Sequence, residues 1–185
     1  MSADRFSEVV SLVLGFEGGY SNNPNDRGGA TNLGITAGTL AAAYRDGLVK
    51  HNDVRKLTRD EAVAIYRARY WNACKCEKMP KPLDALIFDM AVNHGCGGAG
   101  KILQRTLNAV MGKHLTEDGS IGPGTLKSLE KYMSMGSAAT LARQILLFRV
   151  KFYIDIVNRS PKQKTFFWGW LRVRVGELGK KLEVF

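Results

Sequence analysis

Apolar residues recur at three- and four-residue intervals through most of this 185-residue chain, and no other feature constrains its fold as strongly. The clearest helical stripes run through residues 6–17, 83–94, 137–158 and 166–185. Leu171, Val173 and Val175 alternate with arginines as in a strand, but the longer helical spacing of the same segment outweighs this pattern. The spacing therefore predicts a mainly α fold, a bundle of helices with one small β or irregular element after the first helix.

Turn-forming residues mark where the first helices begin and end. Asp4 is placed to cap the first helix, and Gly18-Gly19 is placed to end it. Residues 20–36 are rich in Asn, Gly, Asp and Pro, so we expect a hairpin there with a short strand at Leu33–Ile35. The next helix is expected to start near Thr36.

Further along the chain, Thr58 and Glu61 have the spacing of a capping box and predict another helix start. The glycine-rich segment 95–100 is expected to end the helix before it. A separate helix should follow over residues 102–111.

Composition and length agree with a single globular domain over residues 1–185. The chain is 45% hydrophobic and 24% charged, which provides for a core and excludes a wholly disordered protein. The softest boundary lies at residues 112–122. It would separate a catalytic first part, 1–111, from a helical second part, 112–185, and we expect the two parts to share one core.

The sequence also excludes one class of protein and predicts where the chain is made. No apolar run approaches the roughly 20 residues that a bilayer-spanning helix needs, which excludes an integral membrane protein. The first sixteen residues carry Asp4 and Glu8 among their apolar residues, and only Arg5 as a positive charge, unlike an export signal. We therefore expect synthesis in the cytoplasm without a signal peptide.

Positive charge is concentrated near the C-terminus. The whole chain has 27 Lys and Arg against 17 Asp and Glu, a net charge of +10. Residues 143–185 alone carry ten basic and three acidic residues, or +7. Such a segment predicts attraction to a polyanion, whether nucleic acid, anionic lipid or a cell-wall polymer, unless it is simply a soluble basic surface.

The three cysteines, Cys74, Cys76 and Cys96, are an odd number that excludes a closed disulfide framework and suits a reducing compartment. With His94 they offer four possible zinc ligands. Paired cysteines in zinc sites usually have at least two residues between them, whereas Cys74 and Cys76 have one. We therefore expect ordinary thiols, no metal site and no other cofactor.

Glu17 is an unusual carboxylate for its position. It lies on the apolar face set by Phe6, Val10 and Val13, in the last turn of the predicted first helix. Burial and the negative end of the helix dipole both disfavour the ionised form. Unless it turns out to solvent past the glycines, such a glutamate would stay protonated near neutral pH, as a glycosidase general acid must.

Asp26 is the second candidate, in a polar loop whose surroundings should keep it ionised. A protonated Glu17 and an ionised Asp26 would supply an acid and a base to one site. Thr31 could hold a water molecule against Asp26 through its hydroxyl. The alternative for Asp26 is a purely structural role in a turn.

The same residues resemble a known family. The block from Glu17 to Thr36 is similar to the N-terminal signature of the glycoside hydrolase family 108 muramidases. It comprises Glu17-Gly18-Gly19-Tyr20-Ser21, Asn23-Pro24, Asp26, Gly28-Gly29, Thr31-Asn32 and Gly34-Ile35-Thr36. Three later segments also resemble parts of phage lysozymes, of peptidoglycan-binding domains and of the family's C-terminal region. They are 85–108, 118–126 and 167–171.

The resemblance implies a lysozyme-like fold and an N-acetylmuramidase that cuts the β-1,4 bond between N-acetylmuramic acid and N-acetylglucosamine. It implies that Glu17 is the acid, that Asp26 assists at the opposite face, and that Thr31 positions water. One departure is that four residues separate Asp26 from Thr31, whereas the phage-lysozyme pattern has five. The residues expected to contact the sugar are Tyr20, Asn32, Asp89 and Asn93; Asp89 and Asn93 share a helix face at i, i+4 spacing, unless both simply face water.

The family also implies a biological setting. As a phage endolysin, a peptidoglycan hydrolase would reach the wall only after a partner such as a holin opened the inner membrane; delivery as a secreted effector is the alternative. The basic C-terminal segment would favour contact with an anionic envelope surface. We expect a monomer and no nucleic-acid partner.

Two rival functions remain open from the sequence. A lytic transglycosylase needs one acid–base glutamate and would yield 1,6-anhydromuramic sugars. A non-catalytic module that binds wall or nucleic acid through its charge would release no reducing ends.

Overall fold

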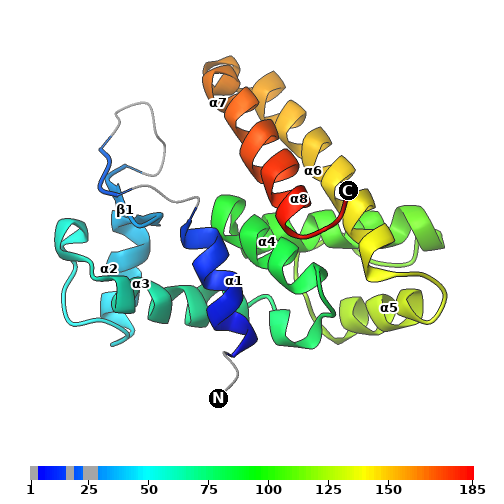
Figure 1. Cartoon of the computed structure of the whole chain (residues 1–185), viewed down its shortest axis with the longest axis horizontal. Helices are drawn as coiled ribbons and strands as arrows, with labels where there is room; N and C mark the ends of the chain where they lie inside the picture. Colours follow the sequence, from blue (N-terminus) through cyan, green and yellow to red (C-terminus); the bar gives the residue numbers. More distant parts are fainter. Residues whose placement is uncertain (1–3, 16–18, 23–28) are drawn as a thin grey trace. The chain divides into compact units, whose positions relative to one another are not determined.

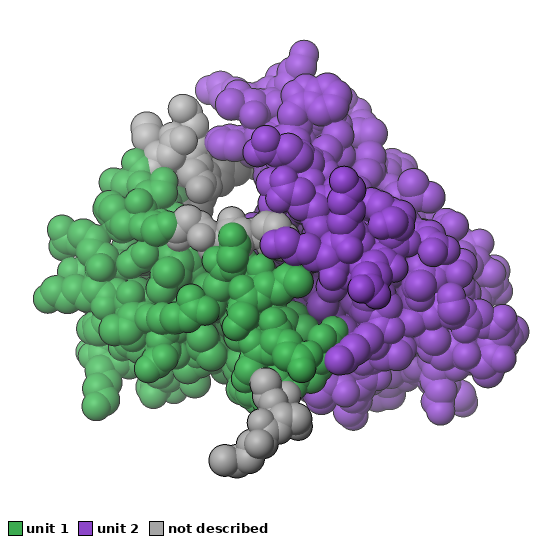
Figure 2. Space-filling model, viewed as in Figure 1, with its two compact units in different colours: residues 1–72 green, residues 73–185 purple. Residues whose placement is uncertain are grey.

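The structure is a computed structural model that describes residues 4–15, 19–22 and 29–185. It confirms a mainly α fold with one small β element (Figure 1). The chain forms two compact units, residues 1–72 and 73–185, which are described separately (Figure 2). The expected division into 1–111 and 112–185 stays a prediction.

The first unit contains three α-helices and a two-stranded antiparallel sheet among its described residues. Its elements are α1 (Arg5–Leu14), β1 (Thr31–Asn32), β2 (Ile35–Thr36), α2 (Ala37–Arg45), the 3-10 helix η1 (Val54–Lys56), α3 (Arg59–Tyr66) and the π-helix η2 (Arg67–Asn72).

Helix α1 buries the apolar face predicted for it, including Phe6, Val10 and Val13. It ends earlier than expected, at Leu14, with Gly15 as its C-cap. Asp4 occupies the N-cap position, but its side chain makes no capping hydrogen bond. The Asp4 carboxylate instead forms an ion pair with Arg67, which engages an oxygen that could otherwise cap the helix.

The hairpin differs from expectation in its register. Leu33 and Gly34, expected within a strand, form the turn, with φ of 50° and 72°. Two consecutive positive φ values are typical of the type I′ turn that joins two-residue hairpins. The Tyr66 hydroxyl donates to the Leu33 carbonyl at 2.7 Å, which helps to hold leucine in a conformation that it rarely adopts.

Both helix starts predicted in this unit are confirmed. Thr36 is the N-cap of α2, and its hydroxyl accepts from the Thr39 amide at 3.1 Å. Thr58 and Glu61 form the capping box of α3, each side chain bonding the backbone of the other.

The second unit is built around two long helices. Its elements are the 3-10 helix η3 (Cys76–Lys78), α4 (Leu83–Met111), α5 (Pro123–Met133), α6 (Ala138–Arg159), the 3-10 helix η4 (Pro161–Gln163), α7 (Lys164–Trp170), the π-helix η5 (Leu171–Glu177) and α8 (Leu178–Lys181). The C-terminal segment is thus helical, as predicted, and returns along α6 (Figure 1).

The expected break after residue 94 is a kink rather than a loop. Only His94 and Gly95 leave the helical conformation inside α4, Gly95 with φ of 82°. The glycines that follow are helical again, and Gly100 packs so closely on Gly119 that an added Cβ would lie 2.0 Å from the Gly119 carbonyl oxygen. Glycine therefore serves close backbone packing here as well as the bend.

Helix α6 lies within the helical stripe predicted over residues 137–158. Its buried face runs from Leu141 and Ile145 to Arg149 and Tyr153, whereas Phe152 is only half-buried. None of the helices in the described part of the chain combines the length and apolar composition that crossing a bilayer requires.

Candidate active site

The two carboxylates predicted to carry the chemistry, Glu17 and Asp26, lie outside the described residues. The structure does describe the strand residues that follow Asp26 and the helix that carries Asp89 and Asn93. The first group belongs to the unit 1–72 and the second to the unit 73–185.

Thr31 is fixed through its backbone on both sides. Its amide and carbonyl each bond Ser21 at 2.8 Å, and its other neighbour in the sheet is Thr36. The two ends of the segment that contains Asp26 are thus held together by the pairing of Ser21 with Thr31. A residue held by pairing on both sides has little freedom of direction, which suits the precise placement of a hydroxyl.

The other two candidates in this unit differ in their freedom. Asn32 donates its side-chain amide to the Val54 carbonyl at 3.0 Å, so its nitrogen supports η1. Tyr20 is 51% exposed and lies near Arg55, whose pKa is raised mainly by the Asp53 carboxylate and slightly by Tyr20. Tyr20 can therefore offer a ring face to a sugar, whereas Asn32 is partly engaged already.

Asp89 is fully enclosed by two arginines. Its Oδ2 lies 2.7 Å from Nη2 of Arg149, and its Oδ1 lies 2.7 Å from Nη1 of Arg174. The side chains of Asp89 and Arg149 are both 0% exposed. A side chain this deeply buried faces neither a sugar, as expected, nor water, the alternative. It is stable there because a buried carboxylate is stable only when it is paired.

Asn93, four residues later, is joined to this ion-pair cluster through Tyr153. Nε of Arg149 donates to the Tyr153 hydroxyl at 2.8 Å, and that hydroxyl donates to Oδ1 of Asn93 at 2.9 Å. Arginine can only donate, so the tyrosine must pass its own proton on, and Asn93 must present its oxygen to it. The amide nitrogen of half-buried Asn93 is thereby left pointing away from Tyr153.

His94 lies beside this cluster, at the kink of α4. Its ring centroid is 4.6 Å from that of Phe152, and neither ring nitrogen has a hydrogen-bond partner among the described residues. Burial, together with the nearby charges of Arg149 and Arg174, holds the pKa of His94 well below its usual range. The ring is therefore a neutral packing element at neutral pH.

The three cysteines gather within the second unit as thiols that form no disulfide among the described residues. A thiol contact with Cys96, and then burial, hold the pKa of Cys74 far above its usual range; burial does the same for Cys76. Among the described residues, no group of three or more His, Cys, Asp or Glu side chains is placed to hold a metal ion. Buried neutral thiols are typical packing residues.

The sequence reasoning missed three residues of the cluster, Arg149, Tyr153 and Arg174. A signal did exist for the first, because Arg149 is the one cation on the helical stripe that joins Ile145 to Tyr153. A lone charge on an apolar face is usually paired, and Asp89 stood on a similar face. The charges of this cluster are enclosed, so they are not available to a ligand. What the cluster can do is orient a hydrogen-bond donor, the side-chain amide of Asn93.

Comparison with known proteins identifies the family of this chain. Residues 10–95 match the family described as glycosyl hydrolase 108, and residues 98–175 match a predicted peptidoglycan domain. No curated protein sequence matches the chain. Among solved structures, Brucella abortus SagA is similar, with 30% identity and a TM-score of 0.78 over 97% of this chain and 94% of that one. These matches show that the chain belongs to glycosyl hydrolase family 108 and is a glycoside hydrolase that acts on peptidoglycan.

Proposed function

We propose that the enzyme is an N-acetylmuramidase, which hydrolyses the β-1,4 bond between N-acetylmuramic acid and N-acetylglucosamine. The observation that carries the proposal is the family match over residues 10–95, which contains the Glu17–Thr36 signature with both of its carboxylates. In this proposal Glu17 protonates the leaving oxygen. Asp26 supports the attack of water from the opposite face of the sugar.

Thr31 has a supporting role in the same step. Its backbone is paired with Ser21 and Thr36, so the position of the Cβ that carries the hydroxyl varies little. A hydroxyl held in this way can keep a water molecule in position for attack, which lowers the entropic part of the barrier.

Asn93 is proposed to hold the substrate's acetamido group. Its oxygen is taken by Tyr153, so its nitrogen is the group available to a ligand. An amide N–H is the natural partner of an acetamido carbonyl oxygen. Asp89 is a positioning residue in this scheme: it holds Arg149, which orients Tyr153 and thereby Asn93.

The test is mass spectrometry of purified sacculi after digestion. The proposal predicts fragments that end in reducing N-acetylmuramic acid and carry one added water per cut. Fragments ending in reducing N-acetylglucosamine would refute the bond assignment. Fragments ending in 1,6-anhydromuramic acid would instead show a lytic transglycosylase.

Glu17→Gln tests the acid. The substitution keeps the size of the side chain but removes its proton, so turnover should fall by about 10²-fold or more. Glu8→Gln is the matched control, because Glu8 is exposed on α1. Activity of Glu17→Gln within a few-fold of the wild type would refute the role of Glu17.

We further propose that the enzyme serves in cell lysis as an endolysin and depends on a holin-like partner. Expression in bacteria with and without a membrane-permeabilising protein tests this. Rapid lysis in the absence of such a protein would contradict the dependence.

A further inference from the structure

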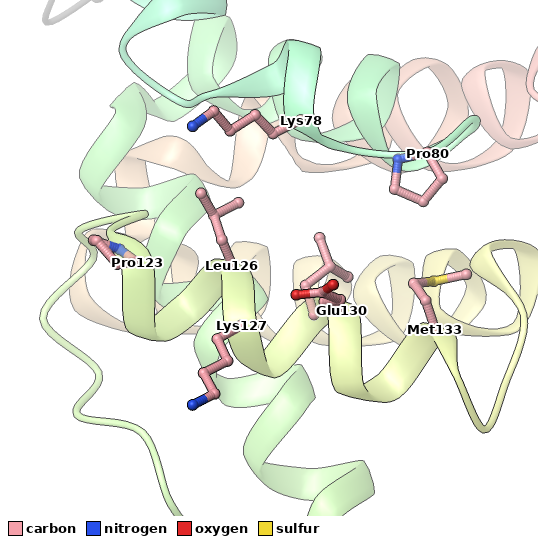
Figure 3. Close-up of a pocket in the computed structure, with 8 residues that line it drawn as sticks. Lys78, Pro80, Pro123, Leu126, Lys127, Glu130 and Met133 are labelled. Carbon is pink, nitrogen blue, oxygen red and sulfur yellow. The ribbon is translucent and has the colours of Figure 1, made fainter.

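The second unit contains a groove whose lining includes no residue of the ion-pair cluster around Asp89. It has a volume of about 790 Å³ and runs between the segment around η3 and helix α5 (Figure 3). Its lining residues are Lys78, Pro80, Pro123, Leu126, Lys127, Leu129, Glu130 and Met133. A volume of this size falls within the range of about 300–1,000 Å³ that is usual for ligand sites.

Both walls of the groove are anchored. On the side of η3, Cys76 and Met79 are buried, so Lys78 projects from a fixed turn. On the other side, buried Gln104 holds the loop before α5: its Nε2 donates to Asp118 Oδ1 at 2.7 Å, and its Oε1 accepts from the Gly119 amide at 2.8 Å. The groove is therefore preformed, which lowers the entropic cost of binding.

The lining has the chemistry of a peptide site. Its apolar floor combines with the ammonium group of Lys78 and the carboxylate of Glu130. Lys127 also lines the groove, but its ammonium group points away from the segment of Lys78 (Figure 3). Leu126 and Met133 point from α5 toward the segment of Lys78, and Glu130 stands between them (Figure 3). A cation and an anion beside an apolar strip complement a short peptide that carries a carboxylate and an amine.

The same lining disfavours the other polymers that a basic protein binds. None of its eight residues is aromatic, so the groove offers no ring for sugars or bases to stack on. Glu130, in the middle of the groove, would repel the phosphates of a nucleic acid.

We propose that this groove binds the stem peptide of peptidoglycan, an inference that rests on the proposed function. Stem peptides carry several free carboxylates, small methyl side chains and, at their third residue, a free amine. Lys78 binds a carboxylate, Glu130 binds the amine, and the methyl groups lie on the apolar floor. Residues 98–175, which match a peptidoglycan domain, supply the α5 wall.

The experiment measures binding of free stem tetrapeptides to the full chain by titration calorimetry. The peptides are N-acetyl-L-alanyl-γ-D-glutamyl-X-D-alanine, with X as L-lysine or meso-diaminopimelate. At least one should bind, and Lys78→Glu should weaken that binding by about ten-fold, about 1.4 kcal/mol. The control Lys131→Glu has the same net charge, at an exposed lysine outside the groove, and should bind as the wild type does.

Three results would overturn the inference. They are the absence of binding by both peptides, equal weakening in the groove and control variants, and unchanged affinity for a peptide whose carboxylates are amidated. Matching thermal midpoints for the groove and control variants ensure that folding does not explain a loss.

Turnover separates this inference from the proposed function. The groove variant should lose activity on peptide-bearing sacculi but keep it on glycan strands stripped of peptide. If the wild type cuts no glycan bond but binds the peptide, the muramidase proposal fails and the groove stands. If it cuts both substrates equally in all variants, the groove inference fails alone.

Discussion

Asp89→Asn tests the buried ion-pair cluster most directly, because it removes one charge and almost no volume. Asp89 is 0% exposed, and each of its oxygens lies 2.7 Å from a guanidinium nitrogen, of Arg149 or of Arg174. The amide that replaces the carboxylate would turn its N–H₂ group toward one of these arginines. The buried Arg149 cation would then lack its counter-charge.

The size of the expected loss of stability follows from the burial of Asp89. Removing one partner of a buried ion pair costs about 3–5 kcal/mol, because the remaining charge stays buried and unpaired. For a chain of this length, 1 kcal/mol corresponds to about 2–4 °C in Tm, so we expect a loss of about 6–20 °C. Urea denaturation and calorimetry of the purified variant would measure both quantities.

Asp155→Asn provides the control. Asp155 pairs with Lys151 at 3.0 Å on the surface of α6, where the lysine side chain is 68% exposed. Exposed helix pairs contribute about 0.3–0.5 kcal/mol, so this variant should unfold close to the wild type. A free energy of unfolding for Asp89→Asn within about 1 kcal/mol of the wild type would show that the cluster does not depend on its carboxylate.

Three further predictions concern the surroundings of this cluster. Tyr153→Phe removes the hydroxyl between Arg149 and Asn93, and should cost about 1–3 kcal/mol in urea denaturation while raising KM for wall fragments more than it lowers kcat. Gly98→Ala would place a Cβ 2.8 Å from Nδ1 of His94 and should cost about 1–3 kcal/mol; an unchanged denaturation midpoint would contradict this close approach. Because burial lowers the pKa of His94, the unfolded chain binds a proton below about pH 6.5 that the folded chain does not. Stability should therefore fall as pH drops below that value, by at most about 1.4 kcal/mol per unit, and His94→Gln should remove that part of the slope.

Local signals in the sequence predicted much of the fold. The capping box at Thr58 and Glu61 depends on two residues three positions apart, and both of its bonds formed as expected. The start of α2 at Thr36 is equally local. Signals of this kind succeed because the interacting groups are close in the chain and need no other part of the fold.

The hairpin and the end of α1 show where such signals are weak. Leucine is an apolar residue of strands more often than of left-handed turns, so Leu33 favoured the wrong register. Gly15 offered a helix end as plausible as Gly18-Gly19, and periodicity alone could not choose between them.

The environment of Asp89 could not be predicted from its own segment. Its partners Arg149 and Arg174 come from 60 and 85 residues later, and an i, i+4 pair with Asn93 looks the same whether it faces water or a core. The roles of Glu17 and Asp26 still rest on the signature and on the family match. The buried cluster forms only when distant segments of the chain pack together, whereas the signature can be recognised within one short segment of the sequence.

The cluster also suggests why a hydrolase would keep a buried charge that an apolar core could replace. Apolar residues of similar volume are often as stable as a buried ion-pair cluster. What apolar residues cannot do is fix the direction of a proton. Arg149 can only donate, so the proton of the Tyr153 hydroxyl must point to Asn93, and the orientation of the Asn93 amide is settled without the substrate. Burying these charges therefore lowers stability but fixes the orientation of the Asn93 amide, which favours binding specificity.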